Sequence, residues 1–144
     1  MRLLKPMKDT EKILRILDAN LNRAREGLRV CEDIARFIYN DRFLTGRFKT
    51  IRHQCSKIIL TLPKLYRSVL LARDTGLDVG KRSVIKDKPA AGWSDLFSSN
   101  VKRAEESLRV LEEVSKIVMP KKSREFQHLR FEVYGLEKKM LERI

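Results

Sequence analysis

The sequence predicts an all-α fold, a pseudo-symmetric helical bundle made of two repeated helical hairpins with a short connecting helix and a long loop. Three observations predict it. A segment of fourteen residues occurs twice, apolar residues recur at helical spacing in both copies, and a second, shorter likeness follows each copy. Two helical hairpins in one chain favour a four-helix bundle.

The internal repeat organises the chain. Residues 20–33 align with residues 100–113 at an offset of 80, and eight of the fourteen positions are identical. The likeness resumes at an offset of 78, where residues 48–52 match residues 126–130. Each repeated unit is therefore expected to be a pair of antiparallel helices.

The apolar residues of both copies are spaced by alternating intervals of four and three, which is the stripe of a long packed helix. The first stripe consists of Leu17, Leu21, Ala24, Leu28, Cys31, Ala35 and Ile38. The second stripe consists of Phe97, Val101, Ala104, Leu108, Leu111, Ser115 and Val118. We expect both stripes in the core, and Cys31 and Cys55 as reduced core thiols rather than nucleophiles.

Polar caps set the helix boundaries in the first repeat, which covers about residues 10–62. A first helix is expected over about 10–39. Asn40 and Asp41 stop it and cap a second helix that begins at Arg42.

A short helix and a loop connect the repeats over residues 63–93. Pro63 suits the first turn of a helix that reaches Ala72. Residues 73–93 contain three of the six glycines and show no apolar periodicity, so we expect a loop of about twenty residues. Loops of that length inside a compact domain are usually functional or disordered.

The second repeat covers about 94–144 and completes a single domain of 144 residues. Ser94 with Asp95 is expected to cap its long helix, and Pro120 ends that helix. Ser123 then caps the last helix.

Composition narrows the function classes. Hydrophobic residues make up 42% and charged residues 35%, which excludes a disordered chain. No apolar run approaches the roughly 20 residues that span a bilayer, and no secretory segment begins the sequence, so we expect a cytoplasmic protein. The net charge of +13 favours an anionic partner, which nucleic acid, an acidic membrane or a phosphorylated small molecule would satisfy.

Two ladders of opposite charges at spacings of three are a candidate binding surface: Arg23, Glu26, Arg29 and Glu32, with Arg103, Glu106, Arg109 and Glu112. One interpretation is a solvated helix face, stabilised by about 0.2–0.5 kcal/mol per pair. The other is anion binding, because both copies keep arginine where lysine would serve a solvated pair. On a helical wheel Asn20, Arg23, Asn100 and Arg103 lie beside the apolar stripes, so they are expected to converge on one groove.

The start of the long loop is a second candidate site. Arg73, Lys81 and Arg82 are suited to binding phosphate, and Asp74 and Asp78 are suited to Mg²⁺. The alternative is that the two aspartates make turn hydrogen bonds and the basic residues are solvated. The segment is not a P-loop, because its glycines are one residue too close and no Ser or Thr follows the lysine.

Three ordered motifs carry a resemblance to a known family: DANLNRAREGLRVCED at residues 18–33, LARDTGLDVG at 71–80 and NVKRAEESLRVLEE at 100–113. The chain resembles the small hydroxymethylpyrimidine-phosphate kinases of thiamine biosynthesis from about residue 16 to 138. That family occurs alone or fused ahead of thiamine-phosphate synthase. The resemblance implies transfer of the ATP γ-phosphoryl group to 4-amino-5-hydroxymethyl-2-methylpyrimidine phosphate, with ATP as co-substrate, Mg²⁺ as cofactor and functional coupling to thiamine-phosphate synthase.

Under this interpretation each candidate residue receives a role. Substrate binding is assigned to Asn20, Arg23, Asn100 and Arg103, and the ATP phosphates to Arg73, Lys81 and Arg82. Catalysis is assigned to Arg73 and Asp74, and the metal to Asp74, Asp78 and Glu106. We expect no nucleic-acid or membrane partner, and the sequence is compatible with a homo-oligomer. The rival hypotheses are a non-catalytic basic helical nucleic-acid-binding protein and a helical scaffold for another thiamine enzyme.

Overall fold

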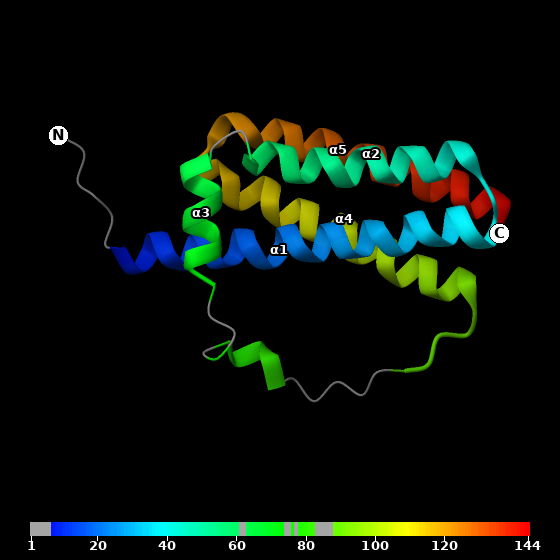
Figure 1. The fold of residues 1–144 in the computed structure, drawn as a ribbon, viewed down its shortest axis with the longest axis horizontal. Helices are drawn as coiled ribbons and strands as arrows, with labels where there is room; N and C mark the ends of the chain where they lie inside the picture. The colour runs from blue at the N-terminus through cyan, green and yellow to red at the C-terminus, as the bar shows by residue number, and fades with distance from the viewer. Residues whose placement is uncertain (1–6, 61–62, 74–75, 77, 83–87) are drawn as a thin grey trace.

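The computed structural model describes residues 7–60, 63–73, 76, 78–82 and 88–144 (Figure 1). Its α-helices are α1 (Met7–Asp33), α2 (Arg42–Leu60), α3 (Pro63–Leu71), α4 (Trp93–Val118) and α5 (Ser123–Arg143). A π-helical turn, η1 (Ile34–Ile38), extends α1, and 3₁₀ turns occupy η2 (Val79–Arg82) and η3 (Pro120–Lys122). These described segments contain no strand, and none of their helices is long and apolar enough to cross a membrane.

The bundle is formed by four long helices, α1, α2, α4 and α5 (Figure 1). α1 packs against α2 and α4, and α5 packs against α4 and α2. Helices that pack against each other run antiparallel, and α3 lies across one end of the bundle (Figure 1). The predicted all-α bundle of two hairpins is therefore confirmed.

The turn of the first hairpin has the predicted chemistry. Asn40 adopts the left-handed backbone conformation, with φ of 51°, which ends the helical segment. The Asp41 carboxylate accepts a 2.9 Å hydrogen bond from the backbone N–H of Leu44, so Asp41 caps α2.

Two other predicted caps are wrong. α4 begins at Trp93, one residue before Ser94, and the Asp95 carboxylate accepts a 2.9 Å hydrogen bond from the backbone N–H of Ala91. Ser123 is the first residue of α5, and its buried hydroxyl donates a 2.9 Å hydrogen bond to the Glu112 carbonyl of α4. Ser123 therefore ties two helices together instead of capping one.

The two predicted apolar stripes form the core. All of their residues are buried except Ile38 and Val118, which lie at the helix ends. Phe48 of α2 and Phe97 of α4 meet edge to face across the core, with ring centroids 6.0 Å apart.

Both cysteines are buried and unbridged, as expected for core thiols. Burial raises the pKa of Cys55 to about 12, and it raises the pKa of Cys31 still further. Neither thiol is therefore poised to act as a nucleophile.

In each hairpin an ion pair joins the two helices, and these two pairs are equivalent in the repeat. Arg52 of α2 contacts Glu32 of α1 at 3.1 Å, and Arg130 of α5 contacts Glu112 of α4 at 2.9 Å. The Arg–Glu pairs occupy equivalent positions of the repeat, and both glutamates are buried. These ion pairs explain why both copies have glutamate at this position, and no ligand is needed to explain it.

α1 and α4 approach each other closely at Gly27. A Cβ atom built on Gly27 would lie 2.8 Å from the backbone oxygen of Asn100 and 3.5 Å from the Cβ of Ala104. Only glycine fits this contact without displacing the backbone of α4. The equivalent residue in the second repeat is Ser107, which is also buried.

Candidate functional site

Two adjoining cavities lie along α1. The smaller one, of about 250 Å³, lies between α1 and α4 and is lined by Asn20, Arg23, Arg103, Glu106, Ser107 and Val110. The larger one, of about 710 Å³, is lined by Lys12, Arg15, Ile16, Asp18, Ala19, Asn20, Asn22, Arg23, Arg73 and Asp78. We call them the acceptor cavity and the loop cavity; they share Asn20 and Arg23.

The acceptor cavity brings together two arginines that are equivalent in the repeat. Arg23 and Arg103 are both exposed, and neither forms an ion pair with any residue that the structure describes. By contrast, Arg29 pairs with Glu32 at 3.5 Å and Arg109 with Glu112 at 3.3 Å. Each ladder therefore divides into a structural half and a half whose guanidinium group is available to an anion.

Asn20 and Asn100 make the same local bond but occupy different surroundings. Each side-chain amide donates a 2.9 Å hydrogen bond to the carbonyl four residues earlier, at Ile16 and Leu96 respectively. Asn20 lines both cavities, whereas Asn100 lines neither. Asn100 lies where the backbone of α4 meets Gly27 of α1.

A paired arginine connects the start of the loop to α1. The Arg73 guanidinium donates two hydrogen bonds of 2.7 Å, from Nε and Nη2, to the two carboxylate oxygens of Asp18. Asn22 also donates to Asp18, at 3.3 Å, and Asp18 is buried. Sequence reasoning missed Asp18, although it begins the first family motif, because its partner lies 55 residues away.

The remaining predicted loop residues are only partly described. Asp78 lines the loop cavity, and its carboxylate accepts a 2.9 Å hydrogen bond from the backbone N–H of Gly80, as in the turn interpretation. The backbones of Lys81 and Arg82 belong to η2, and their side chains lie outside the description. Asp74 lies outside the described residues altogether.

The loop cavity is strongly basic. Lys12, Arg15, Arg23 and Arg73 contribute four cations to its lining, and Asp18 and Asp78 contribute two carboxylates. Apart from the Asp18–Arg73 ion pair, the lining has the three cations of Lys12, Arg15 and Arg23 and the single carboxylate of Asp78. This arrangement suits a ligand with several negative charges on phosphate groups.

The predicted metal ligands do not assemble into a cation cage in the described part of the chain. No group of three histidine, cysteine, aspartate or glutamate side chains occurs there, and Asp78 and Glu106 line different cavities. Mg²⁺ is commonly held by one or two carboxylates together with substrate phosphates. One such carboxylate, Asp78, lines the loop cavity.

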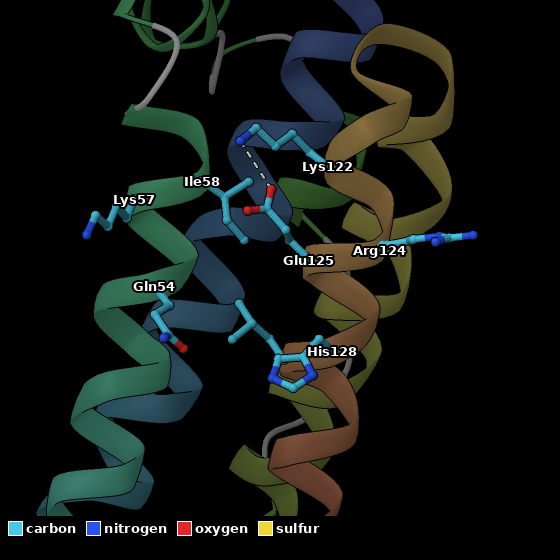
Figure 2. A pocket seen from close by; sticks show the side chains of 8 residues that line it. Gln54, Lys57, Ile58, Lys122, Arg124, Glu125 and His128 are labelled. Atoms are coloured by element: carbon cyan, nitrogen blue, oxygen red, sulfur yellow. Dashed lines mark ion pairs between the residues drawn. The ribbon is translucent and has the colours of Figure 1, made fainter.

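A third cavity, of about 470 Å³, lies between α2 and α5 (Figure 2). Its lining includes three cations, but the side chains of Lys57 and Arg124 point away from the hollow (Figure 2). The ammonium of Lys122 is paired with Glu125 at 3.2 Å. This cavity therefore offers an anion less free positive charge than the two cavities along α1.

The strongest pKa shift among the acidic residues lies away from all three cavities. Burial raises the pKa of Glu105 to about 7, and a hydrogen bond with Glu137 acts in the same direction. Lys102 contacts the two carboxylates at 3.4 and 3.0 Å. Since none of these residues lines any of the three cavities, we interpret the shift as a property of packing between α4 and α5.

Comparison with known proteins places these features in a family. The model of the ThiD2 family matches residues 15–139. The chain is 38% identical over 130 residues to a thiamine-phosphate synthase of Nostoc punctiforme, covering 90% of the chain and 35% of that protein. It is 39% identical to one of Prochlorococcus marinus subsp. pastoris, covering 90% and 36%, and 36% identical to one of Thermosynechococcus vestitus, covering 95% and 38%.

The chain spans about a third of the length of these curated relatives. No solved structure matches it. The family match covers both repeated segments, α2, α4 and the residues of the two cavities from Arg15 onward. With its duplicated helical hairpins and the arginines between them, the chain belongs to the ThiD2 family.

Proposed function

We propose that this chain is an ATP-dependent kinase that phosphorylates 4-amino-5-hydroxymethyl-2-methylpyrimidine phosphate to the diphosphate in thiamine biosynthesis. One observation supports the proposal most directly. Arg23 and Arg103, kept as arginine in both repeats and without an ion-pair partner among the described residues, line one cavity beside a second, more basic one. Two adjoining anion sites are what transfer between two phosphorylated substrates requires.

The chemistry of phosphoryl transfer fits these residues. An oxygen of the phosphate group on the pyrimidine monophosphate attacks the γ-phosphorus, the bond between the γ-phosphorus and the β–γ bridging oxygen breaks, and ADP leaves. Catalysis of this kind depends on positioning and on neutralising charge more than on covalent chemistry. Arginine forks that bind phosphate oxygens in a defined orientation supply both.

The names of the curated relatives support placing this reaction in thiamine biosynthesis. They are named thiamine-phosphate synthases, and this chain matches about a third of their length. A kinase that makes the pyrimidine diphosphate supplies a substrate for thiamine-phosphate synthesis. We therefore propose functional coupling to a thiamine-phosphate synthase.

The test is turnover of the pyrimidine monophosphate with MgATP, followed by formation of ADP and of the diphosphate. Arg23→Lys and Arg103→Lys should each lower kcat/KM by about 10²-fold or more, because lysine keeps the charge and loses the two-pronged contact. Arg36→Lys, at the exposed end of the bundle, is the matched control and should leave kcat/KM unchanged.

Substrate choice is a second readout. The acceptor cavity presents two arginines and one apolar side chain, Val110, so much of the binding energy should come from the existing phosphate. The free alcohol should then have kcat/KM lower by about 10²–10³-fold. A wild-type protein that turns over neither compound, while binding RNA with a steep dependence on salt, would replace the kinase by the nucleic-acid hypothesis.

A further inference from the structure

We infer that the two adjoining cavities are separate subsites: the loop cavity takes the nucleoside triphosphate, the acceptor cavity takes the pyrimidine monophosphate, and Arg23 contacts the phosphoryl group in transit between them. This inference rests on the proposed function and assigns its two substrates to different residues.

Size and charge distinguish the two cavities. The loop cavity has about 710 Å³, with four cations and two carboxylates in its lining, whereas the acceptor cavity has about 250 Å³, with two cations and one carboxylate. A nucleoside triphosphate is the bulkier of the two substrates and has the larger negative charge. It therefore matches the loop cavity in both respects, and the monophosphate matches the acceptor cavity.

The shared boundary determines where transfer takes place. Attack requires the acceptor oxygen and the γ-phosphorus to lie within about 3–3.5 Å, so the two substrates must meet where the cavities adjoin. Among the residues that the structure describes, only Asn20 and Arg23 line both cavities. The Asn20 side chain is neutral and already donates to the Ile16 carbonyl, so Arg23 is the cation at the point of transfer.

One cation in the lining of the loop cavity is held in place by a residue of α1. Asp18 accepts two 2.7 Å hydrogen bonds from Arg73, which fixes that guanidinium at the cavity although Arg73 belongs to the loop. Asp18 is a positioning residue in this scheme. Arg15, on the same helix as Asp18, lines the loop cavity only, and Arg103 lines the acceptor cavity only.

These placements allow one substitution to be compared in each cavity. Arg15→Gln, Arg103→Gln and Arg23→Gln are titrated calorimetrically with a non-hydrolysable ATP analogue and, separately, with the pyrimidine monophosphate. Arg15→Gln should weaken the nucleotide about tenfold and leave the monophosphate unchanged, since one charge-assisted hydrogen bond is lost. Arg103→Gln should do the reverse. Arg23→Gln should lower kcat at saturation with both substrates by about 10²-fold.

Arg124→Gln is the control, because Arg124 lies on α5 and its side chain points away from the third cavity (Figure 2). It should change neither affinity, and circular dichroism of all four variants should match that of the wild type. The assignment would be overturned if Arg15→Gln weakened only the monophosphate and Arg103→Gln only the nucleotide. It would also be overturned if each variant weakened both ligands equally. A wild-type protein that binds both ligands without turnover would contradict the proposed kinase, while the titrations would still test the two subsites.

Discussion

Gly27 of α1 faces the backbone oxygen of Asn100 of α4, at a distance that leaves no space for a methyl group. This contact determines how closely the two repeated helices approach. Along the same pair of helices Arg23 and Arg103 line one cavity, and Asn100 does not line it.

Gly27→Ala should destabilise the protein by about 1–3 kcal/mol, because the new Cβ atom would lie 2.8 Å from a backbone atom that cannot move alone. Urea unfolding followed by circular dichroism measures the difference. Gly135→Ala is the matched control, since Gly135 lies inside α5 with no atom within 4 Å of its added Cβ. That substitution should stabilise by about 0.4–1 kcal/mol, and equal effects at both positions would contradict the account of the seam.

Removing one partner of a buried ion pair should lower the free energy of unfolding. Glu112→Gln leaves the Arg130 guanidinium largely buried with its charge unpaired, so we expect a loss of about 3–5 kcal/mol in the free energy of unfolding. Glu32→Gln should behave alike, since Glu32 has the equivalent contact with Arg52. Glu113→Gln, in an exposed pair with Lys116, should change little. If all three variants unfold at the same urea concentration as the wild type, the ion pairs do not hold the hairpins together.

The stability of the protein should fall as pH rises through the titration of Glu105. Its pKa is about 7 in the folded protein against an ordinary value of 4.5, so the folded state holds the proton more tightly than the unfolded chain. The stabilisation is complete below about pH 4.5 and is lost as pH rises through about 7. Glu105→Gln removes this titration, so the stability difference between wild type and variant should change between pH 5 and pH 8. A difference that stays constant over that range would argue against the shift.

Asp18→Asn should release Arg73 from its place at the loop cavity. The amide cannot accept both guanidinium hydrogen bonds as the carboxylate does, so the KM for ATP should rise about tenfold while the KM for the pyrimidine monophosphate changes little. Steady-state kinetics with each substrate varied in turn provide the measurement. The double variant with Arg73→Lys and Asp18→Asn should raise the KM for ATP little more than either single substitution does, because the two residues act as one unit. Fully additive losses would show that they act separately.

Much of the fold could be predicted because the information is local and occurs twice. The two apolar stripes and the Asn40–Asp41 turn follow from helical spacing and capping chemistry. The failed cap at Ser123 has a tertiary cause, since its hydroxyl bonds to a carbonyl of another helix.

The candidate site also has a part that the sequence predicts and a part that it does not. A helical wheel shows that Arg23 and Arg103 lie beside the apolar stripes, and the structure brings both to one cavity. The wheel does not give the displacement of one helix along the other, so it could not separate Asn100 from Asn20. The Asp18–Arg73 pair joins residues far apart in the chain, and no spacing rule predicts such a contact.

The connection between the hairpins has a length requirement of its own. α3 and the start of α4 lie at opposite ends of the bundle (Figure 1), and α4, with 26 residues, is roughly 39 Å long. An extended chain needs about 11 or 12 residues to cover that distance. A short turn in place of this connection would force α4 to start at the other end and run parallel to α1. Arg103 would then leave Arg23, so the number of residues between the repeats is itself a condition for a two-arginine site.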